Sequence, residues 1–267
     1  MTEDPRSYLE QLGHAGDGPH DIARAALMLA ALDHPALPLE PFRAHLNEIA
    51  DAMKTQAPMI TRVADGAQAL AILLTTRYGY DGDRLRYEDP KNADLIQVIE
   101  RRRGLPVSLG ILYMHAARAT GMIASGLNTQ SHFLVRIGLR HDDVTIDPFN
   151  GGVALEAGTA LPAQLGDAHL AQTVSDTDVL LRLQNNLKIR ALEKDDAKRA
   201  LEIAARMAII APKRPDVWFD LGRLNENAGV LGAARKAYER CLERTPAGEA
   251  LYNEAVLSLS QLKRRLN

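Results

Sequence analysis

RRRGLPVSLGILYMHAARATGM at residues 101–122 is followed by SHFLVRI at 131–137 and VTIDPFNGG at 144–152, and the architecture can be worked out from these three segments. Pro106 favours the first turn of a helix, because its missing N–H costs nothing there. The alternating polar and apolar residues of the two later segments predict strands. The sequence therefore predicts a helix followed by a pair of antiparallel strands. This region carries almost every residue that could do chemistry.

The strand pair presents a histidine and an aspartate, His132 and Asp147. If Gly138–His141 is a four-residue hairpin loop, Ile137 pairs with Asp142, and His132 lies opposite Asp147. Directly opposed residues have Cβ atoms ~4.5–5.5 Å apart, which is within side-chain hydrogen-bonding reach. A shift of one residue would put the two side chains on opposite faces of the sheet. The predicted His–Asp pair therefore depends on the length of the loop.

A period of 34 residues begins near Leu181. The second copy matches the tetratricopeptide pattern at Trp218, Leu221, Gly222, Ala234, Tyr238 and Pro246. The first copy is weaker, but it keeps Ala200 and Pro212 in register. Because two repeats leave an apolar face open, a final capping helix is expected. Its predicted apolar stripe consists of Leu251, Ala255, Leu259, Leu262 and Leu266.

Helical spacing of apolar residues predicts further helices before the central stretch, at 21–32, 39–54, 59–78 and 93–103. Residues 1–20 are polar and rich in Gly, Asp and Pro, so we expect them to be poorly ordered. His34 and His45 have no partner at metal spacing and are expected to be surface or capping residues. The predicted fold is a helix-rich α+β class in three parts: a helical N-terminal region at 1–92 packed on the core, a core with a small antiparallel sheet at 93–178, and helical repeats with a capping helix at 179–267.

Composition narrows the class of protein. The net charge of -2 provides no overall basic field, so no nucleic-acid partner is expected. The longest apolar run, residues 25–32, is far shorter than the ~20 residues of a membrane-spanning helix. The N-terminus does not look like a signal peptide, and a single cysteine, Cys241, fits a reducing compartment. We therefore expect a cytoplasmic protein with no membrane partner.

No cofactor or metal site is predicted. The sequence has no phosphate-cradling glycine loop and no paired-cysteine motif. His132, His141 and Asp147 could converge, but their spacing matches no standard ligand set.

Three segments, DPKNADLIQVIERRRGLPVSLGILYMHAAR at 89–118, SHFLVRI and IDPFNGG, together resemble the SirB-type bacterial transglutaminase-like family. Its members often carry C-terminal tetratricopeptide repeats, and the resemblance covers residues 21–267. It implies a papain-like α+β core, with His132 at the histidine position and Asp147 at that of its acidic partner. In active members of the wider superfamily a cysteine begins the central helix. Counting back from Gly121, that position holds Pro106.

Because Pro106 replaces the cysteine, the sequence does not identify a nucleophile. Proline offers no nucleophile, and Ser108 lies two residues on, which is ~200° of helical rotation. We expect the Ser108 hydroxyl to satisfy backbone groups in the first turn. His132 and Asp147 are either a structural pair that braces the sheet or the remnant of a functional one. Candidates that line the same cleft are Asn128, Gln130 and Arg136.

Two functions from different classes remain. The first is a non-catalytic transglutaminase-like scaffold, a pseudoenzyme, which binds a protein or peptide in the concave groove of its repeats. In the family's groove pattern this groove is lined by Asn185, Ile189, Phe219, Arg223 and Glu226. The repeats could instead merely brace the core. The second function is an amide or ester hydrolase, or an acyltransferase, with Ser108 as nucleophile, His132 as base and Asp147 as the orienting group.

Overall fold

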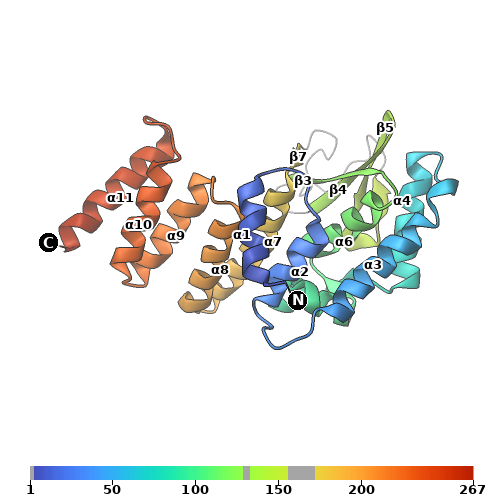
Figure 1. Cartoon of the computed structure of the whole chain (residues 1–267), viewed down its shortest axis with the longest axis horizontal. Coiled ribbons are helices and arrows are strands. Elements are labelled where there is room, and N and C mark those ends of the chain that lie inside the picture. Colours follow the sequence, from blue (N-terminus) through green and yellow to red (C-terminus); the bar gives the residue numbers. More distant parts are fainter. Residues whose placement is uncertain (1–2, 129–132, 156–171, 267) are drawn as a thin grey trace. The chain divides into compact units, whose positions relative to one another are not determined.

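The computed structural model describes residues 3–128, 133–155 and 172–266 (Figure 1). The chain forms two compact units. Unit 1 comprises Met1–Arg6 and Asp17–Leu183, and unit 2 comprises Ser7–Gly16 and Gln184–Asn267. The described strands all belong to unit 1 and make a five-stranded sheet and a separate two-stranded pair, whereas helices dominate both units. The predicted helix-rich α+β class is confirmed, and the finer division at residues 92 and 178 stays a prediction.

In the part of unit 1 that the structure describes, five α-helices come before the main sheet in the chain. They are α2 (Ile22–Ala31), α3 (Glu40–Lys54), α4 (Val63–Ala71), α5 (Leu95–Arg101) and α6 (Pro106–Arg118). Short turns of 3-10 helix are η1 (Ala57–Met59), η3 (Pro90–Ala93) and η4 (Pro148–Asn150). Asp21 and Asp94 cap α2 and α5, each accepting a hydrogen bond from a backbone N–H of the first turn.

The predicted helix at 59–78 is divided. Residues 57–59 form η1, and α4 begins only at Val63, after an extended Arg62. The Asp65 carboxylate fixes this start, since it accepts a hydrogen bond from Arg62 N at 3.2 Å. Beyond Ala71 the helix continues as η2 (Ile72–Arg77), a turn of wider π-helix.

The main sheet is antiparallel, with strand order β6-β5-β4-β3-β7. Its strands are β3 (Ile123–Asn128), β4 (Phe133–Leu139), β5 (Asp142–Asp147), β6 (Val153–Leu155) and β7 (Thr173–Val174). A separate parallel pair joins β1 (Asp81–Gly82) to β2 (Arg103–Gly104), directly before α6. Helix α6 packs against β3 and β4, so the central helix and the strands meet as predicted.

The predicted hairpin register is wrong by two residues. Leu139 pairs with Asp142, so the loop contains only Arg140 and His141. Arg140 adopts a left-handed φ of 59°, which allows this tight reversal. The observed register runs on to the pairs Arg136–Thr145 and Val135–Ile146, and His132, predicted opposite Asp147, lies outside the described residues.

The core of unit 1 surrounds two apolar helices. Helices α2 and α6 are buried along nearly their whole length. At its C-terminal end, α6 contributes Arg118, which holds the buried Asp176 through two bonds of 2.7 Å and also donates to the carbonyl of Ala124. This paired, hydrogen-bonded charge ties α6 to β3 and to the start of α7 (Asp176–Glu193).

Unit 2 contains the predicted repeats. The later part of α7 is followed by α8 (Ala197–Ile210), α9 (Pro215–Asn227), α10 (Leu231–Leu242) and α11 (Ala250–Leu266). Tyr238 and Ala234 of α10 are fully buried against Leu259 and Leu262 of α11. The last helix therefore covers the apolar face of the second repeat, as the stripe of apolar residues predicts.

Residues 5–15 correct the expectation of a poorly ordered N-terminus. They form α1 (Pro5–Ala15), in which Leu9 and Leu12 are buried. Gly13 lies against α8, where a Cβ would come within 2.1 Å of the carbonyl oxygen of Ile209. Composition failed to predict this helix because its order depends on a partner almost 200 residues away in sequence.

Candidate functional site

The start of α6 is built as the sequence predicts. Leu105 is the N-cap in an extended conformation, and Pro106 occupies the first helical turn. The Leu105 N–H donates to the carbonyl oxygen of Asn92 at 3.0 Å, which joins this turn to η3. The helix thus begins with a residue that has neither an N–H nor a nucleophilic atom, and Pro106 is itself buried.

Ser108 lies in the first turn with a fully buried side chain. Its Oγ lies 2.7 Å from the carbonyl oxygen of Asn92 and 3.0 Å from that of Leu105, and both oxygens accept from it. The hydroxyl proton is therefore directed at backbone oxygens of the protein. This is the backbone-satisfying role expected for a serine near a helix start.

Asp147 ends β5, and its side chain is also buried. Its Oδ1 accepts from the N–H groups of Phe149 and Asn150 at 3.0 and 3.2 Å, and its Oδ2 accepts from Asn150 Nδ2 at 2.7 Å. The carboxylate thereby caps η4. Gly151 and Gly152 follow with φ of 74° and 73°, a left-handed conformation that allows the chain to turn tightly after Asn150.

Tyr113 adds an ionisable group to this region. Its side chain is buried, and no described residue makes a hydrogen bond to its hydroxyl. Burial, reinforced by the negative charges of Asp147 and Asp81, raises the pKa of Tyr113 far above its ordinary value. The tyrosine therefore stays neutral. No sequence pattern points to this group, because Tyr113 occupies an ordinary apolar position of α6.

The remaining cleft candidates are only partly described. His132 and Gln130 lie outside the described residues, as does the side chain of Asn128, so the predicted contacts of His132 with Ser108 and Asp147 stay predictions. Arg136 is described, and its Nε lies 3.5 Å from Asp143 Oδ2 on the neighbouring strand.

A second polar cluster was missed at the level of sequence. His45 was expected at the surface, but its side chain is only 12% exposed. Its Nε2 lies 2.9 Å from the Tyr80 hydroxyl, and Arg102 lies within hydrogen-bond distance of both groups. Burial, followed by the Arg102 cation, lowers the pKa of His45 below its ordinary value of 6.5. Positions 45, 80 and 102 come from three separate segments, so no local pattern could join them.

The predicted groove residues of the repeats differ in what they contact. Phe219 packs on the buried ring of Tyr238, and Glu226 accepts a hydrogen bond from the hydroxyl of that tyrosine at 2.9 Å. Burial, followed by this bond to Glu226, raises the pKa of Tyr238 to about 12. Asn185 is half-buried. Ile189 and Arg223 are exposed. Of the five predicted groove residues, Ile189 and Arg223 are therefore the most accessible to a partner.

Across residues 3–128, 133–155 and 172–266, no group of three or more His, Cys, Asp or Glu side chains could hold a metal ion. In the same ranges, no helix combines the length and the apolar character needed to span a bilayer.

Comparison with known proteins places this arrangement in a family. The family model described as "Transglutaminase-like superfamily" matches residues 40–189, which is more than half of the chain. The chain belongs to the transglutaminase-like superfamily. A tetratricopeptide-repeat model matches residues 187–257, so the repeats predicted from the 34-residue period are confirmed.

Proteins similar in sequence occur in bacteria and animals. A UPF0162 protein of Xylella fastidiosa (strain 9a5c) is 27% identical over 237 residues, covering 85% of this chain and 84% of the relative. A UPF0162 protein of Vibrio cholerae is 26% identical over 238 residues, covering 85% and 87%. F-box only protein 21 of Mus musculus is 29% identical over 117 residues, which are 44% of this chain and 17% of that protein. The bacterial relatives confirm the SirB-type resemblance.

Among solved structures, the transglutaminase-like chain is similar to menin. The menin structure, whose title reports the binding site for Mixed Lineage Leukemia protein, aligns with a TM-score of 0.56 and 14% identity. The alignment covers 99% of this chain and 67% of menin. At this identity the likeness concerns the fold.

Proposed function

We propose that this chain is a non-catalytic transglutaminase-like protein, a cytoplasmic scaffold that binds a protein or peptide through its repeats. The observation that carries the proposal is the environment of Ser108. A serine nucleophile must reach the substrate and give its proton to a base. The Ser108 side chain is fully buried, and its hydroxyl donates to backbone oxygens that it would have to leave.

The other groups of the core also support a structural role. Pro106 stands where the superfamily's cysteine would begin the helix. The only thiol, Cys241, is buried in α10 of unit 2, and burial raises the pKa of this thiol, which opposes its reactivity. Asp147 accepts three hydrogen bonds from the turn that it caps. A carboxylate held in this way stabilises the end of β5 without any reaction.

The repeats offer a surface suited to a partner. Ile189 of α7 and Arg223 of α9 lie 34 residues apart, at equivalent positions of successive repeats, and both are exposed. Leu192, one helical turn beyond Ile189, is 41% exposed. Between the helices, Lys188 forms an ion pair with Asp220, so this part of the array is held together. An apolar strip beside charged side chains fits a peptide that presents apolar side chains.

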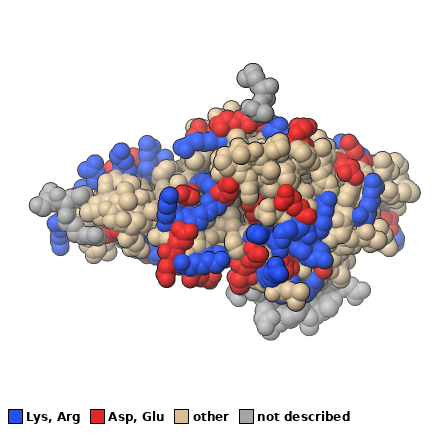
Figure 2. Space-filling view, turned by 90° about the horizontal axis from the view of Figure 1, so that it is seen from below, with Lys and Arg blue, Asp and Glu red and all other residues tan. Residues whose placement is uncertain are grey.

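The charge of the surface also favours a protein partner. Figure 2 shows basic and acidic side chains interspersed over the face in view, and the net charge of the chain is -2. Nucleic-acid binding relies on concentrated positive charge. Menin, which shares the fold, is described by its title as binding another protein.

A covalent probe tests the absence of catalysis. The full-length protein and its Ser108→Ala variant are incubated with a fluorophosphonate that labels activated serines, beside an active serine hydrolase as positive control. We expect the hydrolase to be labelled and neither form of this protein to be. Labelling of the wild type that disappears in Ser108→Ala would show an activated serine and refute the non-catalytic proposal.

A matched pair of variants tests partner binding. Phe219 and Glu226 are unsuitable, because they support the buried Tyr238. We therefore compare Ile189→Ser combined with Arg223→Ser against a control on α10 and α11. The control combines Arg235→Ser with Leu257→Ser, which removes an equally exposed pair of side chains.

The bait is the full chain, and the lysate comes from the organism that makes it. We expect proteins that are retained by the wild type and by the control to be lost from the Ile189/Arg223 variant. If all three baits retain the same proteins, these repeats have no partner in this groove.

A further inference from the structure

We propose that a groove in unit 1, between η1 and the continuous helix α4–η2, binds an amphiphile with an apolar chain and a carboxylate head. This inference goes beyond the scaffold role of the repeats, because every residue of the groove lies in unit 1. It assigns the groove a small ligand of medium chain length.

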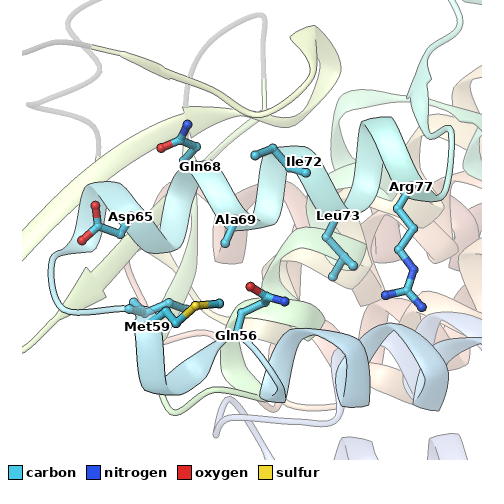
Figure 3. A pocket seen from close by; sticks show the side chains of 9 residues that line it. Gln56, Met59, Asp65, Gln68, Ala69, Ile72, Leu73 and Arg77 are labelled. Carbon is cyan, nitrogen blue, oxygen red and sulfur yellow. The ribbon is translucent and has the colours of Figure 1, made fainter.

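The groove has the size and the lining of a ligand site. Its volume is about 430 Å³, within the range of ~300–1,000 Å³ typical of small-molecule pockets. Its wall residues are Gln56, Met59, Ile60, Asp65, Gln68, Ala69, Ile72, Leu73 and Arg77. Figure 3 shows Ala69 and Leu73 pointing from the helix toward Gln56, with Asp65 at one end and Arg77 at the other.

Its rim exposes apolar side chains that water solvates poorly. Met59 is 66% exposed and Ile72 is 53% exposed, whereas Leu73 at the base is buried. An apolar ligand lying between them would remove these surfaces from water, which is favourable in proportion to the area covered. Methionine adapts its shape to different apolar ligands, because its side chain is unbranched and flexible.

The helix that forms one wall is irregular at this site. Residues 72–77 form a π-helix, which is rare and frequently found at functional sites. The wider turn begins at Ile72 and ends at Arg77, so it spans the part of the groove nearest the arginine. This irregularity is a second feature, independent of the volume, that marks the groove.

The two charged ends of the groove are not equivalent. Asp65 is already paired, since its carboxylate accepts from Arg62 Nη2 at 2.7 Å and from Arg62 N at 3.2 Å. The hydrogen bond from Arg62 contributes most to lowering the pKa of Asp65 below its ordinary value. Arg77 is exposed, and no carboxylate among the described residues forms an ion pair with it. Its guanidinium lies only over the Tyr78 ring, at 5.3 Å.

This charge pattern selects the head group. The unmatched charge of the groove is the Arg77 cation, and a guanidinium binds carboxylates through directed hydrogen bonds. The rise from Ala69 to Arg77 is at most about 12 Å, because an α-helix rises 1.5 Å per residue and the wider π-helix rises less. An extended chain of medium length can therefore cover Ala69 and Leu73 while its carboxylate reaches Arg77.

Methionine methyl NMR provides the test, with decanoate as the probe. The full-length protein, labelled with ¹³C at its methionine methyl groups, is titrated with decanoate below its micellar concentration. The Met59 signal, assigned through Met59→Leu, is followed. We expect this signal to shift and saturate. Decylammonium has the same chain and the opposite charge, so its affinity should be lower than that of decanoate by a factor of about five or more, as expected when an exposed ion pair is lost.

Two variants test separately how the carboxylate head and the apolar chain of decanoate contribute to binding. Arg77→Gln should weaken decanoate binding by about fivefold, since it removes one exposed ion pair. Ala69→Phe should abolish binding, because the ring fills the groove at a half-exposed position that tolerates it. Arg86→Gln, at another exposed arginine of unit 1, is the control and should bind decanoate like the wild type. Circular dichroism checks that each variant is folded.

A Met59 signal that does not move with decanoate would overturn the proposal. So would equal affinity for decanoate and decylammonium, or unchanged binding in a folded Ala69→Phe variant. An equal loss in Arg77→Gln and Arg86→Gln would also contradict it, because it would indicate only a general effect of charge. None of these results bears on the repeats, so the scaffold proposal is tested separately.

Discussion

Replacing Ser108 by alanine should cost stability rather than activity. The substitution removes a hydroxyl that is fully buried and donates to the carbonyl oxygens of Asn92 and Leu105. Each oxygen keeps a backbone donor, from Leu105 N and Leu109 N respectively, both at 3.0 Å. No buried acceptor is therefore left without a partner. The loss is that of one net hydrogen bond and a small void, about 1–1.5 kcal/mol.

Thermal and urea denaturation of the full-length protein measure this effect. For a unit of this size, the loss corresponds to a decrease of the midpoint temperature of about 2–6 °C. Ser260→Ala is the matched control, because Ser260 also donates to a backbone oxygen, that of Val256 at 2.8 Å, but is exposed on α11. Its stability should change by less than about 0.5 kcal/mol.

The opposite outcome would refute the structural role of Ser108. If Ser108→Ala is as stable as the wild type and also loses an esterase activity that the wild type shows, the hydroxyl serves chemistry. A large loss in Ser260→Ala would mean that the measured difference is not specific to the buried serine.

Three other perturbations follow from the structure. Burial and a nearby arginine lower the pKa of His45, so protonation of this histidine favours the unfolded state. The free energy of unfolding of unit 1 should therefore be constant with respect to His45 above pH 6.5 and decrease as the pH falls below 6.5. Urea midpoints measured between pH 8 and 5 should show this decrease, and His45→Gln should reduce it. Gly222→Ala should destabilise the repeats by about 1–3 kcal/mol, because the added Cβ would lie 2.6 Å from the buried ring of Tyr238. Gly232→Ala has open space around it and should be neutral or slightly stabilising in the same denaturation assay. Asp176→Ala should cost about 3–5 kcal/mol by leaving the two hydrogen bonds from Arg118 unmade, and calorimetry should detect this loss.

Each of these predictions has a contradicting result. A pH slope that persists in His45→Gln would assign the proton uptake to another group. Equal effects of the two glycine substitutions would mean that the ring in α10 can move aside. A neutral Asp176→Ala would show that Arg118 finds another acceptor.

The parts of the fold that depend on local signals were predictable. Pro106 marks the first turn of α6, because proline is tolerated there and disfavoured deeper in a helix. The 34-residue period gave the repeats and the capping helix, since each repeat packs on its neighbours through the same positions. The bonds of Ser108 to backbone oxygens also match the role expected from its place in the helix.

Other features depend on contacts that no local pattern encodes. In the tight hairpin Arg140 adopts a left-handed backbone conformation. Gly, Asn or Asp at this position would have predicted such a turn, but arginine does not. The cluster of His45, Tyr80 and Arg102 joins three distant segments. The sequence predicts Asp147 as the group that orients His132, but the bonds of this carboxylate to the following turn match the Asx pattern of DPFN, which is itself a local signal.

The membership of α1 in unit 2 has a consequence for synthesis on the ribosome. Gly13 emerges early, but Ile209, against which it packs, is added almost 200 residues later. At ~5–20 residues per second, the first helix waits roughly 10–40 s for its place to exist. During this interval Leu9 and Leu12 are without their final neighbours. A fragment that starts at Gln184 would lack this helix altogether and would leave the surface beside Ile209 bare, so a recombinant repeat module should include residues 7–16, joined through a linker.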